Sequence, residues 1–297
     1  MNKKENTAKV MFFLVMCVWG TVGVFRRYIP LPSGSIAFVR GAVGALCLLA
    51  VLLIKKEKLT GREIKENIVP LIISGVALGA NWVLLFEAYR YTTVSTATLC
   101  YNMAAVFMSI AAVFVFGERI TLKNGLCILT AFAGMVLVSG ALDAGFGGIS
   151  ELIGIFLGLG AAALYAVVMI LNKKIKDVSA YGKTFVQLTA AAVTILPYTL
   201  IAESLSGVTL DTRGAVMLLI LSLVHTGITY IVYFSSMQRL DVKRIALMSY
   251  IMPIVSMVLS ATVLREEIGL TEIIGAVLIL GATLVGEVLN TKKEVKK

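Results

Sequence analysis

The chain has 297 residues, of which 59% are hydrophobic and only 15% are charged, and its mean hydropathy is +0.93. A soluble domain averages about 25% charged residues, so this chain carries too little charge to cover a water-facing surface. The composition excludes a soluble enzyme of this length, a disordered chain and a fibrous protein. Most residues must face lipid or one another inside a membrane.

The four cysteines and the net charge of +10 fit the same class. Cys17, Cys47, Cys100 and Cys127 lie inside apolar runs with no CxxC pair and no histidine beside them. We therefore expect no disulfide framework, no metal site and no cofactor. The basic residues gather in short links between apolar runs, which is typical of a membrane-orientation signal and not of nucleic-acid binding.

Ten apolar runs follow one another along the chain, each near the ~20 residues that a helix needs to cross the hydrocarbon core. They lack the alternation of polar and apolar residues that marks the strands of a membrane barrel. The first run has no small-x-small cleavage pattern, so we expect a retained helix and not a signal peptide. The expected spans are residues 10–25, 35–54, 69–89, 94–116, 122–141, 152–171, 185–201, 215–234, 245–264 and 270–289.

The lysines and arginines predict the orientation of these spans. With the N-terminus in the cytoplasm, the inside segments hold 21 of them and the outside segments hold 5, while Arg40 lies within a span. Cytoplasmic links carry the excess of positive charge in membrane proteins. We therefore expect both termini in the cytoplasm.

The two halves of the chain are similar to each other. A shift of 148 positions aligns roughly seventy residues without a gap, and places Gly79 on Gly227 and Glu118 on Glu266. A shift of 146 aligns the first span with the sixth. Because each half has an odd number of spans, the second copy must enter the membrane from the opposite side. Such inverted repeats are the architecture of alternating access, with a substrate site near the midplane.

Short motifs in both halves carry a family resemblance. They are Trp19-Gly20, Arg40, the segment from Gly79-Ala80-Asn81-Trp82 to Ala97, Gly117-Glu118-Arg119-Ile120-Thr121, and Ser249-Tyr250-Ile251-Met252-Pro253 followed by Glu266. Together with ten spans in two groups of five, this pattern resembles the EamA-type branch of the drug/metabolite transporter superfamily, over about residues 8–290.

The resemblance implies an all-α integral membrane fold of ten helices and secondary transport, often export, of small metabolites or toxic compounds. It divides the chain into a first repeat (8–141), a second repeat (150–290) and a basic cytoplasmic tail (291–297). The family usually has proline where Ala105 stands, and the second repeat keeps it as Pro253. Proline kinks a helix, so we expect alanine to straighten the fourth span.

Three ionisable residues within or beside the spans are candidates for chemistry. His225 is the only histidine and lies near the middle of the eighth span, so it is a candidate for substrate binding and proton coupling, against a neutral imidazole bonded to a neighbouring helix. Glu87 is the second proton-coupling candidate, as a counter-charge for a cation or as a simple ion pair with Arg90. For Arg40 we expect snorkelling, with Glu87 or a substrate carboxylate as its alternative partners.

Small polar side chains and aromatic rings complete the candidate site. Small and polar residues form a stripe on one face of the fourth span, and a matching stripe lies on the ninth. Such stripes predict either close helix packing or the wall of a polar cavity. Interior aromatics can stack on planar substrates. We expect Glu118 and Glu266 to bond backbone amides at the start of the next helix and to lie outside the site. The predicted substrate-binding residues are Trp19, Asn81, Trp82, Glu87, Tyr101, Asn102, His225, Tyr230, Ser249 and Tyr250.

These observations predict a secondary active transporter that exports a small metabolite, such as an amino acid, an aromatic or a drug-like compound, with possible proton coupling. Import of a small organic cation is the alternative carrier function. A channel or a membrane enzyme is the alternative from another class, but neither a filter loop nor a known catalytic motif is present. The expected partners are a small-molecule substrate and membrane lipid, without nucleic acid, in a monomer or homodimer in the bacterial inner membrane.

Overall fold

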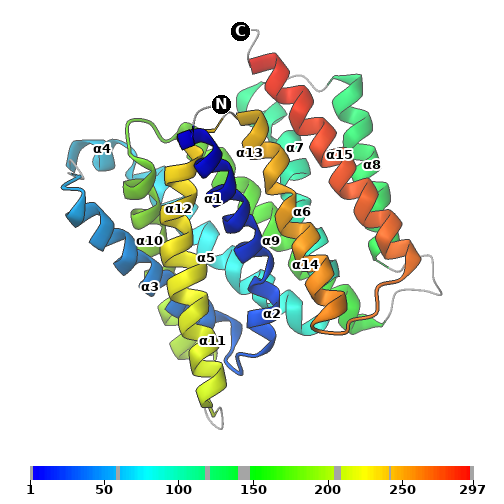
Figure 1. Ribbon diagram of the computed structural model, residues 1–297, viewed down its shortest axis with the longest axis horizontal. Coiled ribbons are helices and arrows are strands. Elements are labelled where there is room, and N and C mark those ends of the chain that lie inside the picture. The colour runs from blue at the N-terminus through cyan, green and yellow to red at the C-terminus, as the bar shows by residue number, and fades with distance from the viewer. Residues whose placement is uncertain are drawn as a thin grey trace.

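A computed structural model describes residues 3–57, 61–117, 121–139, 148–203, 209–240 and 242–294, and its elements are all helices (Figure 1). Glu118 lies outside these residues, as do the end of the tail and the last residues of the expected fifth span. The elements are α1 (Lys3–Gly20), α2 (Val22–Arg27), α3 (Ser33–Ile54), α4 (Gly61–Glu66), α5 (Ile68–Tyr91), α6 (Val94–Asn102), α7 (Ala104–Phe116), α8 (Leu122–Val138), α9 (Ile149–Lys174), α10 (Ala180–Ala202), α11 (Thr212–Ser222), the π-helical η1 (Leu223–Ile228), α12 (Thr229–Met237), α13 (Val242–Ser249), α14 (Ile251–Thr262) and α15 (Leu270–Glu294).

Ten helical passes account for this order, as the apolar runs predicted. Seven segments of the described chain are long and apolar enough to cross a membrane, and three shorter apolar helices, Leu122–Val138, Leu247–Thr262 and Leu270–Gly286, complete the set. Four passes consist of more than one helix, with no more than one residue between the successive helices. They are α1 with α2, α6 with α7, α11 with η1 and α12, and α13 with α14. The chain is a multi-pass membrane protein.

The two halves pack against each other mainly through three pairs of helices. Helix α5 packs most extensively on α9, α3 on α10, and α8 on α15, so each pair joins one half to the other. The first turn of α1 and the last turn of α15 lie at the same end of the bundle (Figure 1). We call this end the terminal face and the other end the opposite face. Since α1 starts at the terminal face and α9 starts at the opposite face, the two five-pass units are inverted.

Glycines allow the closest of these approaches. A Cβ on Gly75 would meet Ala190 of α10 at 2.6 Å, and one on Gly158 would meet Cys100 of α6 at 2.8 Å. Such distances leave no room for a side chain without a shift of the helices. Gly75 and Gly79 of α5, and Gly154 and Gly158 of α9, are therefore sites of close helix contact.

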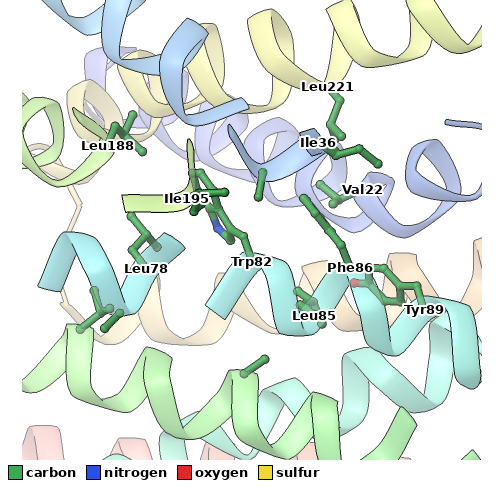
Figure 2. Close-up of a cluster of buried hydrophobic side chains, with 14 of the residues drawn as sticks. Val22, Ile36, Leu78, Trp82, Leu85, Phe86, Tyr89, Leu188, Ile195 and Leu221 are labelled. Carbon is green, nitrogen blue, oxygen red and sulfur yellow. The ribbon is translucent and has the colours of Figure 1, made fainter. Parts of the chain in front are cut away.

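The main apolar cluster lies between α3, α5 and α10. It contains Ile36, Trp82, Phe86, Leu188 and other buried side chains of both halves. Figure 2 shows the Trp82 and Phe86 rings extending from α5 into this cluster. Between helices that lipid surrounds, such packing of close-fitting side chains holds the bundle together. The Trp82 and Phe86 rings of the cluster also pack on the buried side chain of Arg40.

The fourth pass is interrupted at Met103, although alanine and not proline stands at position 105. Helix α6 ends at Asn102 and α7 begins at Ala104, with the amide of Met103 bonded to the Cys100 carbonyl at 3.0 Å in a tight i→i−3 turn. The Asn102 side chain donates to the Thr98 carbonyl at 2.7 Å, which is one turn back. These local bonds break the helix without proline. The ninth pass breaks at the matching place, at Tyr250, before Pro253.

Candidate functional site

The eighth pass contains a π-helical turn at its centre. In η1, side chains bond carbonyls five residues back: Thr226 to Leu221 at 3.3 Å and Thr229 to Val224 at 2.6 Å. His225 Nδ1 makes the same kind of contact with the Ile220 carbonyl at 3.3 Å. The wider turn leaves these carbonyls free for side chains, and single π-turns are frequent at functional sites.

His225 is buried against the break between α1 and α2. Its Nε2 lies 2.7 Å from Thr21 Oγ1, and the indole of Trp19 donates to the His225 carbonyl at 2.9 Å. The ring of Phe25 stands 4.7 Å from the imidazole, edge-on. Both ring nitrogens are therefore engaged, and the histidine joins the eighth pass to the first.

Arg40 lies inside the bundle, so the expectation that it snorkels to the interface is wrong. Its side chain is buried, with the guanidinium carbon 4.4 Å from the centroid of the Trp82 ring and 5.7 Å from that of Phe86. Its Nε donates to Thr226 Oγ1 at 2.7 Å, in the π-helical turn. Stacking on two rings is a geometry that a planar guanidinium favours, and it explains why the side chain stays inside.

Buried and half-buried aromatic side chains gather around Arg40. Tyr89, Tyr101 and Tyr230 are its ionisable neighbours. Tyr165 lies beside Tyr101, with ring centroids 5.4 Å apart. The Trp19 ring contacts Tyr230 and Tyr233 at 5.5 and 5.0 Å between centroids. We call Arg40, His225, Thr226, Trp19, Trp82, Tyr89, Tyr101, Tyr165 and Tyr230 the central cluster.

The central cluster draws on both repeats. The first supplies residues from α1, α3, α5 and α6, and the second supplies residues from α9, η1 and α12. Arg40 bonds Thr226 and packs on Trp82, which both lie near the middle of their passes, whereas Tyr89 lies near the end of α5. The cluster contains five predicted site residues, namely Trp19, Trp82, Tyr101, His225 and Tyr230.

Four other predicted site residues lie elsewhere. Asn81 is fully buried between α5 and α9, where its amide donates to the Ala161 carbonyl at 2.5 Å. Asn102 and Ser249 bond carbonyls of their own helices, at the two matching breaks. Tyr250 forms the second of these breaks. The small polar stripes of α6 and α14 meet directly, with Thr98 Oγ1 3.0 Å from Ser256 Oγ.

Glu87 is held at the opposite face and does not pair with Arg40, contrary to one of the expected pairings. Its carboxylate accepts from Ser33 Oγ at 2.6 Å and pairs with Arg90 at 2.9 Å. The Arg26 guanidinium donates to the same Ser33 hydroxyl at 3.2 Å. Glu87 thus belongs to a polar network with Arg26, Ser33 and Arg90 at the opposite face, outside the central cluster.

Two other carboxylates at the opposite face bridge the repeats. Glu266, at the end of the ninth pass, accepts the amide of Val94 at 2.9 Å and pairs with Arg27 at 2.7 Å. It also accepts from Ser260 Oγ. As predicted it bonds an amide at a helix start, but that helix is α6 of the other repeat and not the next helix in the chain. We call this contact set the Glu266 bridge.

The second bridge was not foreseen. Glu203, at the end of α10, accepts the amides of Gly34 and Ser35 at 2.6 and 2.8 Å, and the Ser35 hydroxyl at 2.8 Å. Carboxylates are favourable at helix N-termini because unpaired amides and the helix dipole both attract negative charge. One sequence signal for it existed, since a shift of 146 places Glu57 on Glu203, each after an apolar run.

Comparison with known proteins agrees with this architecture. The model of the EamA-like transporter family matches residues 6–140 and 152–286, one match for each repeat. A solved structure is similar over 96% of this chain and 98% of its own, with a TM-score of 0.65 at 18% identity, and this likeness concerns the fold alone.

Relatives cover nearly the whole chain. A Bacillus subtilis protein named "Uncharacterized transporter YxxF" is 28% identical over 94% of this chain and 88% of its own length. An Escherichia coli protein named "Probable amino-acid metabolite efflux pump" is 26% identical over 94% of this chain and 93% of its own. These bacterial relatives indicate the plasma membrane as the location. With both of its five-pass units matched, the chain belongs to the EamA-like transporter family.

Proposed function

We propose that this protein is a secondary active transporter that exports a small metabolite by alternating access, with the substrate bound at the central cluster. The observation that carries the proposal is the central cluster itself: buried and half-buried polar and aromatic groups from both repeats around Arg40, whose partners Trp82 and Thr226 lie near the middle of their passes. Inverted repeats place substrate sites near the midplane. The name of the Escherichia coli relative supports export and an amino-acid-like metabolite.

The charge of the site favours export of such a metabolite over import of an organic cation. Arg40 puts a positive charge in the central cluster, while Glu87, the expected counter-charge for a cation, pairs with Arg90 at the opposite face. A cationic substrate would meet a like charge in a region of low dielectric constant, which is unfavourable.

His225 is the candidate for proton coupling. The Thr21 hydroxyl donates to the Val18 carbonyl at 2.7 Å, so its oxygen is left to accept from His225 Nε2. Nδ1 faces the Ile220 carbonyl, which also only accepts. A protonated imidazole satisfies both contacts, whereas a neutral one requires the Thr21 hydroxyl to turn and donate to Nε2. Uptake of a proton therefore needs only rotation of one hydroxyl. Arg40, which bonds Thr226 next to His225, is a charged group in the same region, so a proton on His225 adds a second positive charge to the central cluster.

Flux measurements test this proposal. Proteoliposomes loaded with a metabolite mixture are followed by mass spectrometry, with and without a pH gradient, for the wild type and for His225→Gln. We expect protein-dependent release of a few unaltered compounds, and His225→Gln should remove the dependence on the gradient. Thr194→Val is the control, because its hydroxyl bonds only its own helix on an exposed surface.

Two results would count against the proposal. Chemical conversion of the loaded compounds would point to an enzyme. Wild-type flux and wild-type pH dependence in His225→Gln would exclude His225 as the coupling residue while leaving transport intact.

A further inference from the structure

Arg40 has unused binding capacity. Among the described residues its one hydrogen bond runs from Nε to Thr226, and no carboxylate pairs with it. The two terminal nitrogens make no hydrogen bond to a described residue. Both keep some accessible surface, so they are not sealed off by the surrounding protein atoms. Arg40 is only 6% exposed, so these donors lie within the bundle and not on its surface.

An unpaired positive charge at this depth is costly. A guanidinium keeps its charge in proteins, and charged groups inside a membrane normally pair with one another or with backbone carbonyls. Stacking on Trp82 and Phe86 offsets part of the cost but supplies no negative charge. The remaining donors form a planar fork whose spacing matches the two oxygens of a carboxylate.

The side chains around Arg40 determine which kind of ligand can supply the negative charge. The groups in contact with the guanidinium are the Thr226 hydroxyl and the rings of Trp82 and Phe86. Its ionisable neighbours are tyrosines of the central cluster, whose neutral phenols can donate or accept hydrogen bonds. The adjoining rings of Trp19 and Tyr165 offer flat apolar surfaces. An inorganic anion would use the charge but not the rings, whereas an organic acid uses both.

We infer that Arg40 is the anchor for a substrate carboxylate, and that the substrate is a small organic acid or zwitterion whose apolar body packs on the tyrosine and tryptophan rings. This inference rests on the proposed transport function and narrows its substrate class. It also assigns a role to the π-helical turn. Thr226 accepts from Nε, which restrains the guanidinium and leaves its two terminal nitrogens for the ligand.

Matched probes separate the carboxylate from the rest of the ligand. Four compounds share one aromatic body: 3-phenylpropionate (an acid), L-phenylalanine (a zwitterion), and L-phenylalaninamide and phenethylamine (both cations). Binding of each to the full chain in detergent is measured by the shift of the thermal unfolding midpoint over a concentration series. The variants are Arg40→Gln, Arg40→Lys and the control Arg213→Gln. Arg213 also stacks on an aromatic ring, that of Tyr28, but at the opposite face.

We expect the wild type and Arg213→Gln to bind the acid and the zwitterion at least tenfold more tightly than the two cations. Arg40→Gln should lose this preference. Arg40→Lys keeps the charge but not the planar fork, so its affinity for the acid should fall severalfold while its affinity for the amide stays unchanged. If Arg40→Gln does not fold, the acid-to-amide ratio of Arg40→Lys still decides the question.

Flux of the same four probes from proteoliposomes distinguishes this inference from the proposed function. Arg40-dependent binding of acids without any flux would refute transport of these compounds and leave the carboxylate site standing. Flux that does not discriminate acid from amide, or that keeps its preference in Arg40→Gln, would refute the inference and leave transport standing. Absence of acid binding by the wild type would also overturn the inference.

Discussion

The Glu266 bridge should govern how often the opposite face opens. In Glu266→Gln the side chain keeps its size but loses its charge and one acceptor oxygen, so it cannot hold both Arg27 and the Val94 amide in the same way. The ion pair is partly exposed, at 34% and 13% for the two side chains, and is worth about 0.5–1 kcal/mol. Replacing the charge-assisted bond to Val94 by a neutral one costs roughly 1 kcal/mol more.

A total of about 1.5 kcal/mol corresponds to a roughly tenfold larger open population. Cysteine labelling can measure it. Ser95 is 1% exposed in the first turn of α6, directly beside the bridge. Ser95→Cys, in a background without the four native cysteines, should react with a maleimide about ten times faster when Glu266→Gln is added.

The neighbouring Glu267→Gln is the control, because this exposed side chain undergoes the same change of charge at the same face. The reasoning is refuted if Glu266→Gln labels at the rate of the parent, or if Glu267→Gln accelerates labelling equally.

Two further predictions concern helix breaks and helix packing. Ala105→Pro lies in the first turn of α7, after a break that already exists, and should change stability by less than about 1 kcal/mol, whereas Ala112→Pro in the middle of α7 should cost about 3 kcal/mol or more. Thermal unfolding in detergent checks both, and equal losses would show that α6 and α7 act as one helix. Gly158→Val should destabilise the protein by about 1–3 kcal/mol, because a Cβ there meets Cys100 at 2.8 Å, while Gly281→Ala, with open space around it, should be neutral in the same measurement.

The ten passes and their grouping could be predicted from sequence because they depend on the length and number of apolar runs. A lipid-facing helix needs about 20 apolar residues, and five passes per repeat force the inversion. The glycine contacts of Gly75 and Gly158 were also predictable, since small residues at a spacing of four mark close helix pairs.

The breaks and the position of Arg40 could not be predicted in this way. The turns at Thr21 and Met103 interrupt continuous apolar sequence and depend on hydrogen bonds that hydropathy does not register. Arg40 was expected at the interface because its long side chain can reach water. It stays inside because the rings of Trp82 and Phe86 pack on its guanidinium and Thr226 accepts from its Nε. Glu203 was missed because its partners are backbone amides of α3, which the match with Glu57 in the internal repeat does not identify.

The carboxylate bridges have a consequence for how modular the two halves are. Helix α3 starts after Pro32, which offers no side chain to cap it, so its first amides rely on Glu203 of the other half. The first half therefore relies on the second for hydrogen bonds at the starts of two of its helices, α3 and α6. A chimera that joins residues 1–147 to the second half of a relative would keep ten apolar helices. It would assemble as this protein does only where the donor carries an acid that reaches the start of α3.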